Sequence, residues 1–388
     1  WVFNRFRIYR ETLSRFRAPL HPAGKTFVTG ALFLKSNMTF EIQKGAILKG
    51  STNAEDYPLE KGYQIYSYQT NDTDSRRPPS LLNVLSADHR NGTKDELTGY
   101  DDRRGVFQNI RVVGEGTLDG SGWLRSETDT KDEAGKTLAY FANSGRSSVF
   151  DQGKLAANQL MAAWKSYDDS WSTKAELLQL IEDKYNGLDS APNTDLYSNR
   201  RSSLTTFRGV NNLYFGGLHL SNPALHGVMF LESENVVFAY TNTQTFDINN
   251  ADGVEFGNSK NSVVLANFID SGDDCINFAA GQGAAYTTGQ EPSEKSWIIN
   301  NYTREGHGAV VAGSHTGAWI QDILAEDNVS FLTDRGLRLK STTTTGGGAR
   351  RIVFRDNALK NIGTKNSLEV NGVTIKNRGG TGETLWRH

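Results

Sequence analysis

The chain has 388 residues, 42 Lys and Arg against 44 Asp and Glu, and a formal net charge of −2. This balance gives no general attraction to nucleic acid or to an anionic membrane, and no apolar run approaches the roughly 18 residues that a membrane-spanning helix needs. The single cysteine, Cys275, excludes an intrachain disulfide, and we expect it to be a buried core residue.

The first residues differ in pattern from the rest. Residues 1–19 carry five arginines between apolar residues spaced three or four apart, which is typical of an amphipathic helix. We interpret residues 1–24 either as a basic leader or as a cap over the first coil of a repetitive structure, since open strand edges recruit other chains. No apolar signal core follows Trp1, so we expect any secretion signal to be already removed or absent from this chain.

From Lys25 onward the chain reads as a series of short strands. Apolar and polar residues alternate in these segments, which indicates half-buried strands, and glycines separate them. Three segments, 212–215, 235–238 and 261–264, begin 235 − 212 = 23 and 261 − 235 = 26 residues apart. Such a period is typical of a solenoid. We therefore predict an all-β fold, a right-handed single-stranded parallel β-helix over residues 25–388.

Three insertions interrupt this rhythm, at about 51–104, 120–203 and 279–295. In the second, Thr173-Lys-Ala-Glu176 is a capping box that predicts a helix ending at Gly187. Its apolar content is too small for a separate domain, so we expect the insertions to be long loops on the solenoid, as on solenoid binding faces.

Four polar clusters lie at the ends of predicted strands. They are Asn250-Ala-Asp-Gly253, Gly272-Asp-Asp274, Gly306-His-Gly308 and Arg335-Gly-Leu-Arg-Leu-Lys340. Equivalent positions on adjacent coils lie about 4.8 Å apart, so these clusters should converge into one patch of acids beside bases. Because Arg338 and Lys340 are two residues apart, they should share one strand face while Leu337 and Leu339 turn into the core.

The carboxylates fit cleavage of a glycosidic bond, which needs one protonated and one ionised carboxyl group. Asp252 should lie one coil before Asp273 and beneath it. Asp273 and Asp274 are neighbours, so both reach the cleft only if the chain bends, as Gly272 would permit. Three acids so close should raise one pKa and keep a proton available. The alternative is a solvated or turn-capping ladder of aspartates.

In this order, the four clusters resemble the NTDG, GDD, GHG and RIK pattern of glycoside hydrolase family 28, the polygalacturonases. Gly313-Ser-His-Thr-Gly-Ala-Trp319 looks like the bacterial exo-polygalacturonases of that family. The resemblance, over roughly residues 20–360, implies hydrolysis of α-1,4-galacturonosidic bonds by general acid/base catalysis with inversion. It makes Asp273 the acid and gives Asp252 and Asp274 the activation of water. Stacking on adjacent coils instead suggests carboxyls nearer the roughly 5 Å of retaining enzymes.

The resemblance also implies the groups around the reaction. His307 would contact substrate and support protonation of Asp273, while Arg338 and Lys340 would pair with the substrate carboxylate. Salt bridges from these two bases to the aspartates, or a plain turn histidine, are the alternatives. We regard His226 and His315 as weaker candidates, and expect a packing or surface role for Trp123, Arg200 and Arg201.

We expect no cofactor and no metal. The implied partner is pectic polysaccharide, polygalacturonate or its oligomers, acted on by a monomer in a secreted or periplasmic location. Exo cleavage fits the insertions, which would wall off one end of the cleft; endo cleavage or a rhamnogalacturonan hydrolase remains open. From other classes, a calcium-dependent pectate-lyase-like enzyme or a non-catalytic polysaccharide-binding β-helix could use the same solenoid.

Overall fold

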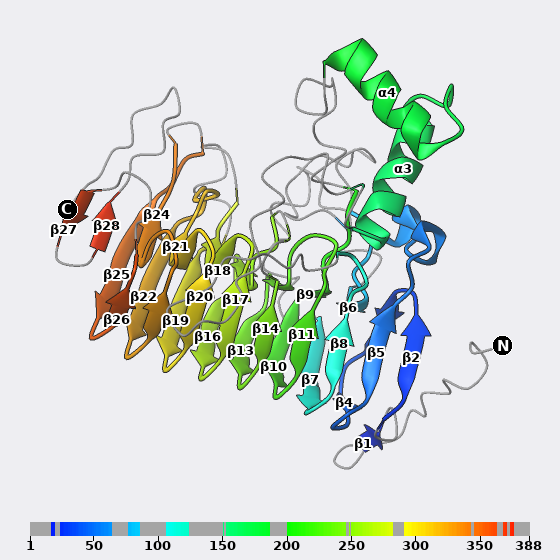
Figure 1. The fold of residues 1–388 in the computed structure, drawn as a ribbon. Coiled ribbons are helices and arrows are strands. Elements are labelled where there is room, and N and C mark those ends of the chain that lie inside the picture. The colour runs from blue at the N-terminus through cyan, green and yellow to red at the C-terminus, as the bar shows by residue number, and fades with distance from the viewer. Residues whose placement is uncertain are drawn as a thin grey trace.

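The computed structural model describes residues 17–19, 24–63, 77–85, 106–123, 150, 153–186, 200–245, 248, 250–281, 291–342, 345–362, 368–370 and 373–375. Three parallel sheets wind around one axis, and each coil adds one strand to each sheet (Figure 1). The sheets have nine, nine and eight strands, so the predicted right-handed parallel β-helix is confirmed.

We call the three sheets A, B and C. Sheet A contains β1 (Arg17–Pro19), β4 (Met38–Ile42), β7 (Phe107–Gly114), β10 (Val210–Gly216), β13 (Glu234–Ala239), β16 (Lys260–Leu265), β19 (Ser293–Ile299), β22 (Ile320–Glu326) and β25 (Ala349–Arg355). Sheet B contains β2 (Thr26–Thr29), β5 (Ile47–Gly50), β8 (Thr117–Asp119), β11 (His219–Ser221), β14 (Asn242–Gln244), β17 (Phe268–Ser271), β20 (Tyr302–Glu305), β23 (Val329–Phe331) and β26 (Ala358–Lys360). Sheet C contains β3 (Leu32–Phe33), β6 (Leu82–Val84), β9 (Thr205–Arg208), β12 (Val228–Leu231), β15 (Val254–Gly257), β18 (Asp274–Ala279), β21 (Gly308–Ala312) and β24 (Leu337–Leu339).

The core is built from like residues stacked on successive coils. Phe207, Phe230, Phe256 and Phe278 point inward from sheet C, with ring centroids 5.7, 5.2 and 5.2 Å apart from one coil to the next. Each is fully buried. Aromatic rings in this contact add to the free energy that burial of their surface provides, so this stack fixes the spacing of sheet C. Cys275 is also buried in the core, as predicted.

An asparagine ladder holds the coils together at one turn. The side-chain amides of Asn267, Asn301 and Asn328 each donate to the amide oxygen of the next asparagine, ending at Asn357, at 2.9 Å in every step. Asn301 also donates to the backbone oxygens of Val264 and Ile299. Buried amides need such partners, and here each one connects adjacent coils.

The second insertion forms two helices, α3 (Leu155–Tyr167) and α4 (Lys174–Tyr185), which rise above the early coils in Figure 1. The predicted capping box at the start of α4 is confirmed, since Thr173 and Glu176 bond reciprocally. The helix ends at Asn186, in a left-handed conformation (φ 55°), one residue before the predicted stop. Side chains of α3 share one buried cluster with Trp123, Ile248 and Ala251, so the insertion packs onto the solenoid.

The other insertions and the two ends of the chain complete the described part of the fold. The first insertion holds β6 and two short helical turns, η1 (Ala54–Asp56) and η2 (Leu59–Lys61), within its described part. β1 pairs with β4 in sheet A, and residues 1–16, where a helical stripe was expected, lie outside the described residues. β27 (Leu368–Val370) and β28 (Val373–Ile375) form an antiparallel pair.

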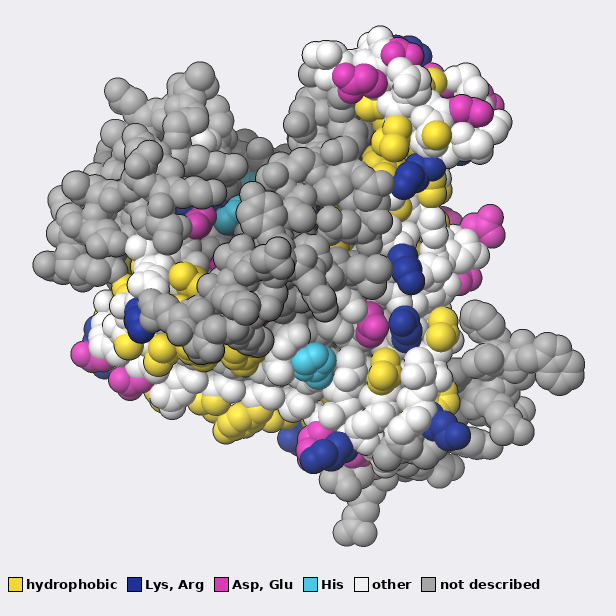
Figure 2. Space-filling view, in the orientation of Figure 1, with side chains coloured by type: hydrophobic (Ala, Val, Ile, Leu, Met, Phe, Trp, Pro, Cys, Tyr) yellow, Lys and Arg dark blue, Asp and Glu magenta, His cyan; other side chains and the backbone are white. Residues whose placement is uncertain are grey.

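The outer face of sheet A carries a row of hydrophobic side chains in direct register, including Tyr214, Val263, Trp297 and Val353. Hydrophobic side chains gather along the lower edge of the solenoid in Figure 2, where these strands lie. In the described part of the chain, neither helix is long and apolar enough to cross a membrane.

Candidate active site

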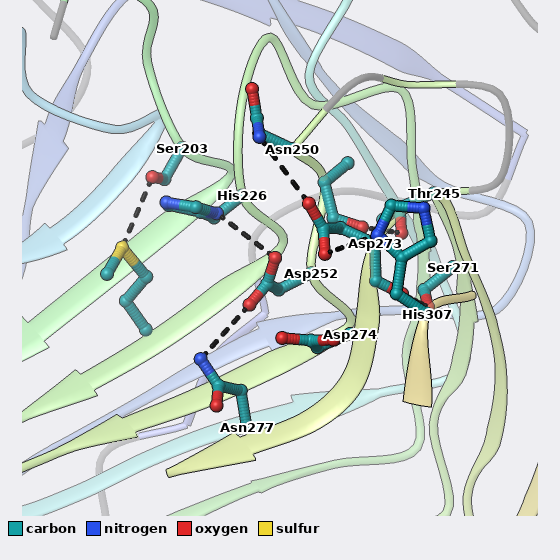
Figure 3. Close-up of polar contacts among 12 residues, drawn as sticks. Ser203, His226, Thr245, Asn250, Asp252, Ser271, Asp273, Asp274, Asn277 and His307 are labelled. Carbon is teal, nitrogen blue, oxygen red and sulfur yellow. Dashed lines mark hydrogen bonds and ion pairs between the residues drawn. The ribbon is translucent and has the colours of Figure 1, made fainter. Parts of the chain in front are cut away.

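Residues just before successive strands of sheet C form a column. Val254 of β15 pairs with Ile276 of β18, so Asp252 lies opposite Asp274, two positions earlier on each coil. The backbone N–H of Gly253 donates to the carbonyl of Asp274 at 2.9 Å, consistent with this register. The expectation that Asp252 lies beneath Asp273 is therefore wrong by one residue, because this coil repeats after 22 residues instead of 21. The three carboxylates nevertheless converge, as Figure 3 shows.

Asp273 lies in the tight turn between β17 and β18. Gly272 is required there for close approach, since a side-chain Cβ on it would lie 2.3 Å from the carbonyl oxygen of Ile248. The Ser271 hydroxyl donates to the Asp273 carbonyl at 2.8 Å and holds the turn closed. The predicted bend therefore exists, and it brings the side chains of Asp273 and Asp274 into one cluster with Asp252.

The Asp273 carboxyl group is held from both sides. Its Oδ1 lies 3.1 Å from Nδ1 of His307, and its Oδ2 accepts from the side-chain amide of Asn250 at 3.4 Å (Figure 3). Gly306 (φ 77°) lets His307 approach, because a Cβ on Gly306 would lie 2.5 Å from the Asp273 carbonyl oxygen. His307, whose side chain is 36 % exposed, can therefore contact both Asp273 and a ligand in the cleft.

The Asp273–His307 contact shifts both groups toward their charged forms. Burial by itself would raise the pKa of Asp273, but the hydrogen bond and charge of His307, with the charge of Lys340, bring it below its usual range. Burial by itself would lower the pKa of His307, but the hydrogen bond and charge of Asp273 raise it. At mildly acidic pH this pair carries one proton, which resides on the imidazole.

Asp252 is the carboxyl group whose pKa is raised. It is 5 % exposed, and burial, together with the charges of Asp273 and Asp274, raises its pKa well above the usual value. Its Oδ1 lies 3.5 Å from Nδ1 of His226, and its Oδ2 accepts from Asn277 at 3.4 Å. The expectation that crowding raises one pKa is met, but on Asp252 and not on Asp273, the acid implied by the family resemblance.

Asp274 is paired with the two predicted bases. Arg338 Nη1 donates to its Oδ1 at 3.0 Å, and Lys340 Nζ donates to its Oδ2. Leu337 and Leu339 pack against the core, so the predicted alternation along β24 is confirmed. The bases therefore point toward the carboxyl cluster and form the salt bridges to an aspartate that were the alternative to substrate binding. The remaining N–H groups of Arg338 and Lys340 can still bind a carboxylate.

The other sequence candidates separate into core and site residues. Trp123 is fully buried in the cluster beneath α3, so the expected packing role is confirmed. Arg201 is also fully buried and donates to the carbonyl of Ala224 and to Oδ1 of Asn250. Arg200 is buried as well. His315 receives a backbone hydrogen bond from Ala280 at its carbonyl oxygen.

Three residues at the site went unrecognised or were undervalued. Glu255 is 3 % exposed, and burial raises its pKa to about 7. Asn277 is its register partner on β18. Glu255 and Asn277 alternate with inward-facing residues along their strands. The same alternation correctly placed Arg338 and Lys340 outside the core. His226 occupies the column one coil before Asp252, and burial lowers its pKa well below the usual value.

His226, Asp252 and Glu255 each offer a ligand atom within 4.8 Å of the other two. A metal ion needs neutral imidazole and ionised carboxylates. Burial and neighbouring carboxylates raise the pKa of both acids, so this site favours protons over ionised ligands. We therefore assign no metal to it.

Comparison with known proteins places the chain in a family. The model of "Glycosyl hydrolases family 28" matches residues 188–382, half of the chain. An "Exo-poly-alpha-D-galacturonosidase" from Dickeya chrysanthemi is 48 % identical over 341 residues, which are 88 % of this chain and 49 % of that protein.

Solved structures agree. The family 28 exopolygalacturonase of Yersinia enterocolitica matches with a TM-score of 0.72 and 46 % identity, over 87 % of this chain and 52 % of that one. An exopolygalacturonase from Thermotoga maritima, 19 % identical with a TM-score of 0.60, shows the fold alone. The chain spans about half the length of the first two relatives. The motifs, the solenoid and these matches together show that the chain belongs to family 28 of the glycosyl hydrolases.

Proposed function

We propose that the protein hydrolyses α-1,4-galacturonosidic bonds of polygalacturonate from one end of the polymer. One observation carries the substrate class: three carboxyl groups able to cleave a glycosidic bond lie together, and Arg338 and Lys340 pair with one of them. A uronic sugar is the substrate whose glycosidic bond and carboxylate such a cleft would hold together. The similarity to the Dickeya and Yersinia enzymes supports this proposal.

In the proposed reaction, Asp273 protonates the leaving oxygen. Its proton comes from His307 across the 3.1 Å contact, because a bound sugar displaces water and makes the ionised carboxylate less favourable. Asp252 and Asp274 hold the attacking water, and one of them accepts its proton. Attack on the face opposite the leaving oxygen inverts the anomeric carbon.

Exo cleavage is supported by the position of the helical insertion. α3 shares a buried cluster with Ala251, the residue before Asp252, so the insertion lies against the N-terminal side of the catalytic column. Gln159 of α3 also exchanges two hydrogen bonds with Ser202, at 2.7 and 2.8 Å. An element fixed so firmly at one side of the cleft would block a polymer from passing through.

Product analysis on polygalacturonate tests the proposal. Monomer or dimer as the sole early product supports exo hydrolysis, graded oligomers indicate endo hydrolysis, and products absorbing in the ultraviolet indicate a lyase. Binding of polygalacturonate without any product would indicate a non-catalytic polysaccharide-binding β-helix. Asp273→Asn should abolish turnover without changing the thermal melting temperature by more than a few degrees; full activity in this variant would refute the assignment of Asp273. Proton NMR of the first product would show inversion or retention.

The location and assembly of the protein follow as further proposals. A polymer cannot cross a membrane to reach an internal enzyme, so we propose a secreted or periplasmic location, which cell fractionation tests. We also propose a monomer, which size-exclusion chromatography with light scattering tests.

A further inference from the structure

Arg77 and His226, two buried side chains with polar atoms that lack hydrogen-bond partners among the described residues, lie on the side of Asp252 that faces away from Arg338 and Lys340. Those two bases lie on or beside β24, two coils beyond β18. On the other side, Arg77 precedes β6, three coils before β15. It is 7 % exposed, and its Nε and Nη1 have no hydrogen-bond partner in the part of the chain that the structure describes.

Tyr63 places Arg77 near the first coil of the column that contains Ser203, His226, Asp252 and Asp274 at equivalent positions. Tyr63 and Arg77 pair through their backbones, with hydrogen bonds of 3.0 and 2.8 Å. The Tyr63 hydroxyl lies 3.6 Å from the sulfur of Met229 and 3.3 Å from the hydroxyl of Ser203. Met229 is the register partner of Glu255 on the next coil, and Ser203 holds the position of His226 one coil earlier.

Electrostatics agrees with this placement. Burial raises the pKa of Glu255, and the positive charge of Arg77 opposes this effect more strongly than that of Lys340 does. Burial lowers the pKa of His226, and the charge of Arg77 lowers it further. The cleft therefore has a guanidinium on each side of the carboxyl cluster, although only one of them has an aspartate as its partner.

The groups around Arg77 and Asp252 match the polar atoms of a sugar. Among described residues, the side-chain oxygen of Asn277 and Nδ1 of His226 are buried and accept no hydrogen bond. Figure 3 shows the Asn277 amide nitrogen turned toward Asp252 and its oxygen turned away. Leaving buried donors and acceptors unpaired costs free energy, which a ligand bearing hydroxyls and a negative charge would recover.

We propose that Arg77 binds the carboxylate of the uronic acid unit on the opposite side of the scissile bond from the unit held by Arg338 and Lys340, and that Glu255 holds a hydroxyl of that same unit. This inference rests on the proposed function. Under this proposal the enzyme recognises a free carboxylate on each of the two sugar units that flank the bond it cleaves. A methyl ester on either unit removes one charge-assisted contact.

The test uses trigalacturonate and two analogues, each methyl-esterified on one of the two units that flank the cleaved bond. Wild-type kcat/KM should fall about 10- to 100-fold for either ester, the range expected for a hydrogen-bonded charge pair. Arg77→Gln should lose this discrimination at one unit only, and Lys340→Gln should lose it at the other. Arg77→Lys, which keeps the charge without the planar donors, should retain part of it.

Controls separate folding from recognition. Arg304→Gln removes another buried arginine, paired with Asp270 on sheet B, and should lower the melting temperature while keeping discrimination at both units. If Arg77→Gln does not fold, the Arg77→Lys variant alone tests the inference. Full discrimination against the methyl ester at both units in Arg77→Lys would then overturn it. Loss of discrimination by Arg77→Gln and Lys340→Gln at the same unit also overturns it. If the wild-type enzyme does not cleave unesterified trigalacturonate, the proposed function itself fails.

Discussion

The contact between His307 and Asp273 predicts how activity depends on pH. His307→Gln keeps a side chain that can donate a hydrogen bond but removes the proton that the imidazole carries. A hydrogen bond to a charged group contributes about 1.5–3 kcal/mol, and the 36 % exposure of the His307 side chain places this one at the low end. A loss of about 1.5 kcal/mol from the transition state is about a tenfold loss in kcat.

The direction of the pH effect follows from the two pKa shifts. The pKa of His307 is raised, so its contribution is fully present below its unfolded value of about 6.5 and is lost as pH rises through the folded value. The pKa of Asp273 is lowered, so its contribution is present above about 3.9 and is lost as pH falls through the folded value. We therefore expect the alkaline limb of kcat to lie above pH 6.5 and to report the loss of the His307 proton.

The assay is kcat against pH from 4 to 9 with polygalacturonate, measured by reducing ends. In His307→Gln the alkaline limb should move or disappear along with the tenfold loss. His219→Gln is the matched control, because His219 begins β11 of sheet B, away from the sheet C column, and its removal should leave the profile unchanged. An alkaline limb that stays in place in His307→Gln would refute the proton supply from His307.

Three further predictions test stability and charge. Burial raises the pKa of Glu255 to about 7, so folding takes up a proton between about pH 4.5 and 7, and the free energy of unfolding declines as pH rises through this window. In urea unfolding, Glu255→Gln should therefore stabilise the protein by roughly 3 kcal/mol at pH 8 and by little at pH 4.5. Equal effects at both pH values would contradict this prediction. Asn301→Ala breaks the asparagine ladder and should cost about 3–5 kcal/mol of unfolding free energy, whereas Gln179→Ala on the exposed face of α4 should cost less than about 0.5. Lys340→Met leaves buried Asp274 with Arg338 alone and should raise KM while lowering the melting temperature; a double-mutant cycle with Asp274→Asn that shows no coupling would exclude the ion pair as the cause.

The sequence predicts the architecture well because the solenoid repeats simple local rules. Alternation along 337–340 places Leu337 and Leu339 in the core and both bases outside, and this is set by strand geometry alone. The capping box of α4 is likewise a local pattern, and it forms as predicted. Features that depend on a few consecutive residues are therefore the ones that sequence reasoning recovers.

The features that sequence reasoning misses depend on how the coils stack. Whether Asp252 faces Asp273 or Asp274 depends on the length of one turn, which differs by a single residue between the two possibilities. The location of the raised pKa depends on burial and on the final place of His307, and neither is written in the motif. Arg77 lies far in sequence from every motif, and only the pairing with Tyr63 brings it near His226.

The asparagine ladder has a consequence for how this enzyme would fail on heating. The acids and bases of the site are spread over four turns of the spiral, with Asp252 on one, Asp273 and Asp274 on the next, then His307, and then Arg338 and Lys340. Amide links between the asparagines set the gap between these turns. No subset of turns retains the full set of reacting groups. Separation of any two neighbouring turns between Asp252 and Lys340 would therefore end activity at once, well before the bulk of the spiral unwinds.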